Sequence, residues 1–98
     1  MNPTYARTDA ELYRFLKRNS YGKAEYDSPV AVKVRFEPYR RKVLSATGEE
    51  ILSSGKVFCF SELKVNDMLW VLGNSYIIAR VDPAMTLSGE VSHWEAIV

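Results

Sequence analysis

This chain has one cysteine, one histidine and no long apolar run, and each scarcity excludes a class of protein. A single cysteine excludes an internal disulfide and a metal site built from several cysteines. No apolar stretch approaches the roughly 20 residues of a membrane span, and the N-terminus lacks a signal-peptide pattern. There is no glycine-rich phosphate loop and no cluster of metal ligands. We therefore expect a soluble protein from a reducing compartment, with no membrane partner, metal or cofactor.

An excess of charge of one sign is also missing, because 13 basic residues nearly cancel 12 acidic ones. That balance gives no indication of a nucleic-acid or membrane partner. What is present is an apolar fraction of 47% in 98 residues, which is ordinary for one globular domain. A domain of this size leaves much apolar surface exposed, so we expect it to associate with other chains.

The clearest pattern is an alternation of apolar with polar or small side chains over residues 30–37. This period of two predicts a strand with one buried face and one solvated face. Three consecutive basic residues at 40–42 and a polar turn at 45–50 come next. Gly48 can adopt a positive φ in that turn. We predict that the chain then returns in a long strand over residues 51–60.

Upstream of these predicted strands, residues 9–18 have the pattern of a short helix of about three turns. Thr8 and Glu11 have the spacing of a capping box. Leu12 begins a narrow apolar stripe at helical spacing, with further apolar residues three and four positions later. We therefore predict a helix that lies on the barrel or on a neighbouring subunit.

Downstream, the pattern stays β. Residues 68–72 form a short run predicted to be buried, and Gly73–Asn74 are predicted to be the two-residue loop of a hairpin. The next predicted strand covers residues 75–81, and Asp82–Pro83 is expected to break it. The last predicted strand covers residues 91–98.

These elements predict a mainly β domain over residues 1–98, which we expect to be a small antiparallel β-barrel or sandwich of five or six strands. It has a short N-terminal helix and a long loop between early strands. Within it, residues 1–28 are expected to form an N-terminal arm with the helix, and residues 29–98 the barrel. The predicted buried residues lie on strand faces or in short apolar runs: Val32, Val34, Phe36, Trp70, Ile78 and Trp94, the last sharing a face with Ala96 and Val98.

The chain offers few groups for catalysis. His93 is the only histidine, and we expect it to face solvent on the last strand. Cys59 lies in an apolar strand and is expected to be a buried, unreactive thiol. Asp67 and Asp82 fall in predicted turns, where aspartate is favoured for its hydrogen bonds to the backbone. No spacing indicates a carboxylate pair for acid–base chemistry, so we predict no catalytic residue and no enzyme.

One alternative function stays open. Tyr39 stands beside Arg40, Arg41 and Lys42, and aromatic residues fall on predicted strands. Small barrels with these features bind single-stranded nucleic acid by stacking bases on aromatic side chains. The competing interpretation is a solvated turn with the aromatic residues in the core, which the near-zero net charge favours. A small β-barrel nucleic-acid-binding protein is therefore the alternative hypothesis.

The order of the sequence segments from Tyr26 to Val98 resembles a known family. The segment Pro-Val-Ala-Val-Lys-Val-Arg-Phe-Glu leads into Arg-Arg-Lys-Val, a turn with Gly-Glu-Glu, and Ile-Leu-Ser-Ser-Gly-Lys-Val-Phe. Leu-Lys-Val-Asn-Asp and Gly-Asn-Ser-Tyr-Ile-Ile-Ala-Arg-Val follow, and the chain closes on Gly-Glu-Val-Ser-His-Trp-Glu-Ala-Ile-Val. This succession is similar to that of the head completion proteins of tailed bacteriophages, also called head–tail connector, stopper or minor capsid proteins. The helix predicted over residues 9–18 is less typical of the pattern.

The resemblance implies a non-enzymatic structural protein of the virion, made in the host cytoplasm. It implies a β-barrel protomer in a homo-oligomeric ring, sixfold or twelvefold, at the neck between head and tail. The implied partners are the portal or adaptor protein on one side and the tail-terminator or tail protein on the other. Such a ring closes the DNA-filled head and provides the tail attachment surface. A ring uses heterologous interfaces that close by rotation, which a small β-domain can supply.

In related proteins a long loop between early strands points toward the central channel, and the matching stretch here is Tyr39 to Ser54. We expect packaged DNA near it, and we expect the loop to be mobile in the free protomer and ordered in the ring. Its small and polar residues offer few local anchors. The competing interpretation is a rigid hairpin packed on its own barrel. The candidate channel or inter-subunit residues are Tyr39, Arg40, Arg41, Lys42, Val43, Leu44, Thr47, Gly48, Glu49, Glu50, Ile51 and Leu52.

Overall fold

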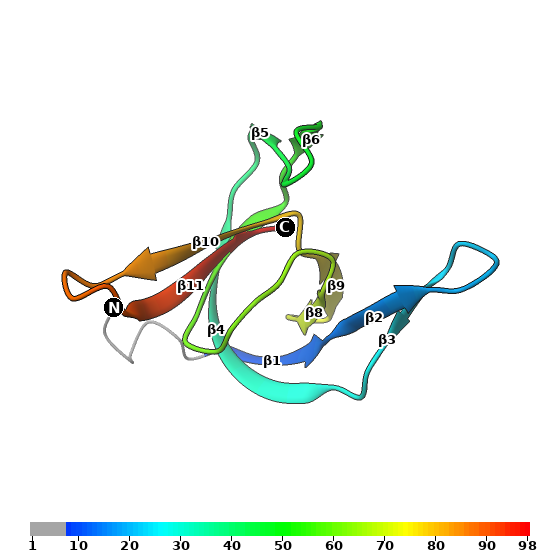
Figure 1. The fold of residues 1–98 in the computed structure, drawn as a ribbon, viewed down its shortest axis with the longest axis horizontal. Coiled ribbons are helices and arrows are strands. Elements are labelled where there is room, and N and C mark those ends of the chain that lie inside the picture. The colour runs from blue at the N-terminus through cyan, green and yellow to red at the C-terminus, as the bar shows by residue number, and fades with distance from the viewer. Residues whose placement is uncertain (1–7) are drawn as a thin grey trace.

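The computed structural model describes residues 8–98, which form eleven short β-strands and no helix (Figure 1). The strands are β1 (Thr8–Tyr13), β2 (Phe15–Arg18), β3 (Ala24–Tyr26), β4 (Val30–Pro38), β5 (Lys42–Leu44), β6 (Glu50–Leu52), β7 (Gly55–Cys59), β8 (Met68–Val71), β9 (Asn74–Ile77), β10 (Arg80–Met85) and β11 (Val91–Ile97). Since these residues contain no helix, none of their segments is a helix able to cross a membrane. The predicted mainly β class is confirmed.

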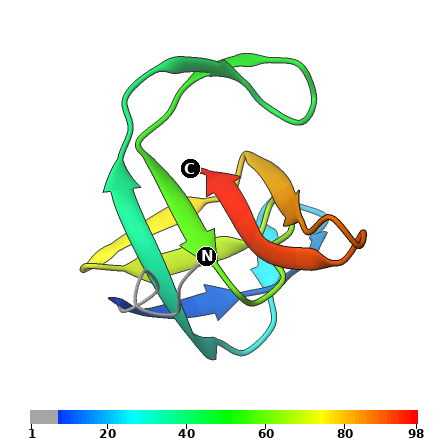
Figure 2. The same ribbon diagram turned by 90° about the vertical axis from the view of Figure 1, so that its left-hand side faces the viewer.

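Seven strands form one antiparallel sheet in the order β10-β11-β7-β4-β1-β8-β9. β9 and β10 are consecutive in the chain but occupy opposite edges of this sheet. The link Ile78–Ala79 joins them because the twisted sheet curls until its edges approach each other (Figures 1 and 2). The Ala79 N–H donates to the Ile97 carbonyl at 2.8 Å, which fixes this link. The sheet is therefore a curled half-barrel.

The core lies inside the curl and is built mainly from alternate residues of the strands. The residues of this cluster are Ala10, Leu12, Val32, Val34, Val57, Cys59, Leu63, Leu69, Val71, Ile78, Ala96 and Val98. Val32, Val34 and Ile78 are buried as predicted, and Phe36 and Trp94 are partly buried against the cluster.

The helix predicted over residues 9–18 is wrong, because these residues form strands β1 and β2. Ala10 and Leu12 are 6% and 1% exposed, whereas Asp9 and Glu11 at the intervening positions are exposed. β1 is paired on both sides, with β4 and with β8. A helix would leave the edges of both neighbours unpaired, so sheet pairing outweighs the local capping-box pattern.

β2 and β3 form a separate hairpin that continues β1 away from the half-barrel (Figure 1). Its base is held by Asp67, which is 2% exposed. The Phe15 N–H donates to Asp67 Oδ1 at 2.8 Å, and Arg14 Nη1 donates to Asp67 Oδ2 at 2.9 Å. The expected backbone hydrogen bonding of Asp67 is confirmed. This buried carboxylate fixes the direction in which the hairpin leaves the half-barrel.

The predicted hairpin after residue 68 is present, with its loop displaced by one residue. Val71 pairs with Asn74, so the loop is Leu72–Gly73. Its φ angles of 53° and 80° suit the type I′ turn that matches strand twist. Trp70 was predicted to be buried and is 47% exposed, because Leu69 and Val71 occupy the inward positions of β8.

Two further predictions near the C-terminus are wrong. Asp82 and Pro83 do not break the strand but lie inside β10. β10 is an edge strand, where proline is tolerated, and Asp82 is exposed beside Arg80 instead of serving a turn. His93 does not face solvent, since its side chain is only 16% exposed and its ring centroid lies 6.4 Å from that of Phe58. The last strand is confirmed as β11.

Candidate functional site: the β5–β6 hairpin

The candidate residues lie together on a second hairpin that projects from the half-barrel (Figures 1 and 2). β4 ends at Pro38, the chain forms β5 and β6, and it returns to the sheet in β7. The long return strand predicted over residues 51–60 is therefore two strands, interrupted at Ser53–Ser54. The interruption lets β6 pair with β5 alone while β7 pairs with β4 and β11.

The base of the hairpin is closed by Ser53, which is 1% exposed. Its hydroxyl donates to the Tyr39 carbonyl and accepts from the Arg41 N–H at 3.1 Å. The Ser53 N–H also donates to the Arg41 carbonyl at 2.9 Å. One small hydroxyl residue thus satisfies backbone groups of both chain segments where they leave the half-barrel.

The C-terminus holds the same base from the other side. The N–H groups of Ser54 and Gly55 donate to the Val98 carbonyl at 2.6 and 3.1 Å. Gly55 faces the ring of Phe36, and a Cβ atom there would overlap the ring. Phe36 itself stacks on Tyr76, with ring centroids 5.1 Å apart. The crowding explains why glycine stands at the point where the chain re-enters the sheet.

The two faces of the hairpin differ in exposure. Opposite residues in register are Val43 with Ile51, Lys42 with Leu52, and Leu44 with Glu50. Val43 and Ile51 are half-buried, whereas Leu44 and Leu52 on the other face are 57% and 60% exposed. Lys42 Nζ lies 3.8 Å from Glu50 Oε1 across that outer face. The outer face therefore has two exposed leucines and one solvent-exposed ion pair.

The tip of the hairpin turns at residues 45–49 and touches the half-barrel. Gly48 has φ of 87°, as predicted for this turn. The Ser45 N–H donates to the Glu49 carbonyl at 2.8 Å, and the Ala46 N–H donates to the Ala79 carbonyl at 3.0 Å. Thr47 and Glu49 are exposed. The hairpin is thus fixed at its base and at one point near its tip.

Positive charge gathers around Tyr39 at the base of the hairpin. Arg41 Cζ and Lys56 Nζ lie 5.7 and 4.6 Å from the centroid of the Tyr39 ring. Arg40, between Tyr39 and Arg41 in the chain, is exposed. Within residues 8–98, none of these three cations has an ion-pair partner, unlike Lys42. Cations over an aromatic face with no paired carboxylate form a surface that attracts anions.

Groups for catalysis do not assemble in the described part of the chain. Residues 8–98 hold no group of three or more histidine, cysteine or acidic side chains able to bind a metal ion. Cys59 is buried as predicted, and burial raises the pKa of its thiol, which disfavours the reactive thiolate. Within residues 8–98, His93 Nε2 lies 3.6 Å from Glu95 Oε1, and His93 Nδ1 lies 3.3 Å from the hydroxyl oxygen of its neighbour Ser92.

Sequence reasoning did not identify two residues of this site. In the sequence, Ser53 is one of several small polar residues of a predicted loop. Only the backbone positions of Tyr39 and Arg41 show that it closes the hairpin. Lys56 is distant in sequence from Arg41, and the pairing of β4 with β7 brings it beside Tyr39. Its alternation with the inward-facing Val57 was the one available signal that Lys56 points outward.

A family model described as "Minor capsid protein" matches residues 7–98, which is nearly the whole chain. A search of the curated proteins finds no match.

Proposed function

Because this chain belongs to a family of minor capsid proteins, which are structural components of the virion, we propose that it forms the neck ring of a tailed bacteriophage. The ring lies between the portal or its adaptor and the tail. It closes the DNA-filled head and presents the surface to which the tail attaches. In this role the protein is structural and catalyses no reaction.

The observation that supports this role most directly is the projecting β5–β6 hairpin. Val43 and Ile51 on its inner face are half-buried, while Leu44 and Leu52 remain exposed on the outer face. Exposed apolar residues on a small element are typical of a surface that is buried on assembly. In a ring of six or twelve copies, the hairpin lines the channel or contacts the next subunit, and its outer face becomes buried there.

The cationic base of the hairpin gives the second part of the proposal. Arg41 and Lys56 lie over Tyr39, Arg40 is exposed between Tyr39 and Arg41 in the chain, and none of the three has an ion-pair partner among residues 8–98. Packaged DNA in the channel presents a high density of phosphate charge to the neck. Contacts of this kind are independent of sequence and weaken as salt rises. The DNA end is then held at the neck by charge and not by base recognition.

The experiment is complementation of a phage in which this gene is inactivated. With the full chain supplied, we expect tailed, DNA-filled particles, and electron microscopy of particles carrying a tagged chain shows the density at the neck. A chain lacking residues 45–50 is expected to fold but to give heads that lose DNA or lack tails. A chain in which residues 45–50 are replaced by a glycine–serine segment of equal length separates loss of length from loss of these side chains. Density on the capsid shell, or normal tails without the chain, would reject the neck proposal.

A nucleic-acid-binding protein is the second candidate, and the Tyr39 surface is the observation that favours it. The test uses the isolated chain and a fluorescent single-stranded oligonucleotide at physiological salt. Submicromolar affinity that is lost in Arg41→Ala and Lys56→Ala, and kept in Lys64→Ala, supports this second candidate. For the neck protein we expect no such affinity in the monomer, because three cations give only weak, salt-sensitive binding.

A further inference from the structure

The β2–β3 hairpin is a basic arm that is held at its base and pairs with no other strand of residues 8–98. We call residues 14–26 the arm. The bonds from Asp67 hold its base, and the rings of Phe15 and Tyr26 pack edge to face with centroids 6.1 Å apart. Within residues 8–98, no strand other than its own pair packs extensively on β2 or β3. A two-stranded hairpin is marginally stable alone, so an arm held this way suits a contact with another molecule.

The chemistry of the arm is apolar and positive. Leu16 and Tyr21 are 58% and 88% exposed. Lys17, Arg18 and Lys23 are also exposed, and none of them forms an ion pair within residues 8–98. Arg18 donates a hydrogen bond to the Gly22 carbonyl at 3.3 Å and lies over the Phe15 ring with Cζ 5.9 Å from the centroid, both within the arm. The arm therefore presents an aromatic tip and three exposed cations against one carboxylate, Glu25, which lies opposite Lys17 in the register of β2 with β3.

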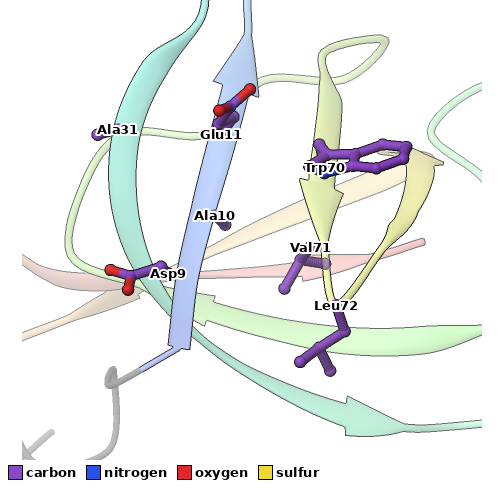
Figure 3. A pocket seen from close by; sticks show the side chains of 7 residues that line it. All are labelled: Asp9, Ala10, Glu11, Ala31, Trp70, Val71 and Leu72. Carbon is purple, nitrogen blue, oxygen red and sulfur yellow. The ribbon is translucent and has the colours of Figure 1, made fainter.

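The outer face of the sheet carries a groove of complementary chemistry. Two shallow hollows that share Asp9 and Ala31 cross strands β8, β1 and β4. Figure 3 shows one of them, with Ala31 on β4 at one edge and the side chains of β1 and β8 across from it. The exposed side chains of Trp70 and Leu72 form one end, and Phe60 forms the other. We call this surface the outer groove.

The outer groove also contains a carboxylate without a cation partner within residues 8–98, that of Glu11. Glu11 lies opposite Trp70 in the register of β1 with β8. Its carboxylate accepts a hydrogen bond from the Tyr13 hydroxyl at 2.9 Å and has no cation partner within residues 8–98. Asp9 at the centre of the groove is already paired with Lys33. Glu11, opposite Trp70 in the register, is therefore the carboxylate of the groove that can attract a cation.

The arm cannot reach the outer groove of its own chain. β2 continues β1 outward from the sheet, and the buried bonds of Asp67 fix that direction (Figure 1). Two complementary surfaces that cannot meet within one molecule can meet between two copies. We propose that the arm of one subunit binds in the outer groove of the next, with Tyr21 packed against Trp70 and Lys17 or Lys23 paired with Glu11. This is a heterologous contact, so it produces rings or filaments and not closed dimers.

The apolar and the charged parts of the arm–groove contact are expected to play different roles in binding. Burial of aromatic residues at the centre of a contact supplies most of its affinity, which assigns that part to Tyr21 and Trp70. Charge complementarity sets the orientation and suppresses wrong partners. The arm–groove contact deepens the proposed function, because it names how successive subunits of the ring are joined. It does not depend on where in the virion the ring lies.

The first experiment is a charge reversal with rescue. Association of the purified full chain is measured by sedimentation over a concentration series at low salt. Glu11→Lys alone, or Lys17→Glu with Lys23→Glu, is expected to weaken association by about tenfold or more. The chain that combines all three changes is expected to recover association, since each copy again has an arm and a groove of opposite charge. Lys64→Glu is the matched control on a loop outside both surfaces and is expected to change nothing.

The second experiment tests the direction of the contact. Tyr21→Ser removes the apolar tip of the arm, and Trp70→Ser removes the wall of the groove. Both residues are exposed, so both variants are expected to keep the melting temperature of the parent chain. Each variant alone is expected to stay monomeric. Their mixture is expected to form dimers and nothing larger, because each pair then has one intact arm and one intact groove.

Three results overturn the arm–groove contact: a parent chain that is monomeric throughout the series, reversals that leave association unchanged, and a triple variant that is not rescued. A mixture of the two serine variants that stays monomeric does the same. These outcomes are distinct from failure of the neck proposal. Neck rings that still form from variants of the arm would support the neck proposal and contradict the arm–groove contact. Arm-dependent assembly found elsewhere in the virion would support the arm–groove contact and contradict the neck proposal.

Discussion

The two tryptophans show how strand position decides the role of a residue. Trp94 on β11 packs against the core cluster, whereas Trp70 on β8 points to the outer face and is 47% exposed. Trp70 stands in the apolar run 68–72 and Trp94 between His93 and Glu95, so an apolar neighbourhood would favour burial of the wrong tryptophan. The register separates the two, because Trp70 lies opposite Glu11 and Ser75, which also face outward. The same side chain is therefore structural at one site and available for contacts at the other.

The two sites should differ in their contribution to stability. Trp94→Ala is expected to lower the free energy of unfolding by about 2–4 kcal/mol, since it opens a gap against the core. Trp70→Ala is expected to change it by less than about 1 kcal/mol. Urea denaturation of both variants measures the difference. Equal losses would mean that Trp70 is covered in the free chain and that the outer face is not open.

Asp67 is the residue on which the arm depends. Its carboxylate accepts from Phe15 and Arg14, and it is almost fully buried. Asp67→Ala is expected to cost about 1–3 kcal/mol, because it leaves a buried N–H unsatisfied and Arg14 without its partner. The estimate stays modest because the Arg14 side chain is 32% exposed and regains water.

Asp82 provides the matched control for Asp67. It is an exposed aspartate paired with Arg80, which is itself exposed. Asp82→Ala is expected to change the free energy of unfolding by less than about 0.5 kcal/mol. Thermal unfolding of the two variants, side by side, gives the comparison. A loss at Asp82 as large as that at Asp67 would contradict the assignment of Asp67 as the anchor of the arm.

At the scale of elements, the β5–β6 hairpin shows which features of a projecting element the sequence predicts and which it does not. Residues 39–54 were predicted to be a long loop between early strands, and they form a hairpin with a closed base and one contact near the tip. Its position and its turn at Gly48 follow from the sequence. Its pairing apart from the main sheet does not, because that depends on Ser53, whose hydroxyl bonds only to residues 12 and 14 positions away.

Hydrogen exchange tests how firmly this hairpin is held in the free chain. Ser53→Ala removes the hydroxyl that bonds the return segment to the backbone of Tyr39 and Arg41. The change is expected to speed hydrogen exchange at Val43 and Ile51 at least about tenfold. Exchange in β4 and β7 is expected to change far less. Ser54→Ala, at an exposed neighbour, is the control. The prediction that residues 39–54 become further ordered in the ring requires slower exchange at Val43 in the assembly; equal protection in monomer and assembly would reject it.

At the scale of the whole molecule, the first described strand, β1, is an interior strand of the sheet. β1 lies between β4 and β8, and it places Ala10 and Leu12 in the core. Asp67 connects two other parts of the fold. Its backbone carbonyl accepts from the Ile78 N–H of the closing link Ile78–Ala79, and its carboxylate accepts from the Phe15 N–H at the base of the arm. The half-barrel is therefore assembled from both ends of the chain, as its high proportion of long-range pairings requires.

Truncation tests this dependence. A chain that begins at residue 29 loses β1 and the arm, so β4 and β8 gain unpaired edges and the core loses Leu12. We expect it to be unfolded or aggregated, because exposed edges favour association. Deletion of residues 19–22 from the turn of the arm is the control and is expected to keep the melting temperature within a few degrees. A folded, monomeric 29–98 fragment would show that β1 is dispensable.

The sequence by itself determined the strand class, the inward positions of β4, the hairpin after residue 68 and the inert burial of Cys59. In each case the signal is local: alternation over a few residues, a glycine with positive φ, or an apolar neighbourhood. It also carried the order of segments that placed the chain among minor capsid proteins. Only the tertiary structure decided that residues 9–18 are strands, that Trp70 faces outward, and that Lys56 lies beside Tyr39. These features depend on backbone pairing between distant segments, and pairing energy outweighs the weak local preferences that favoured a helix or a buried run.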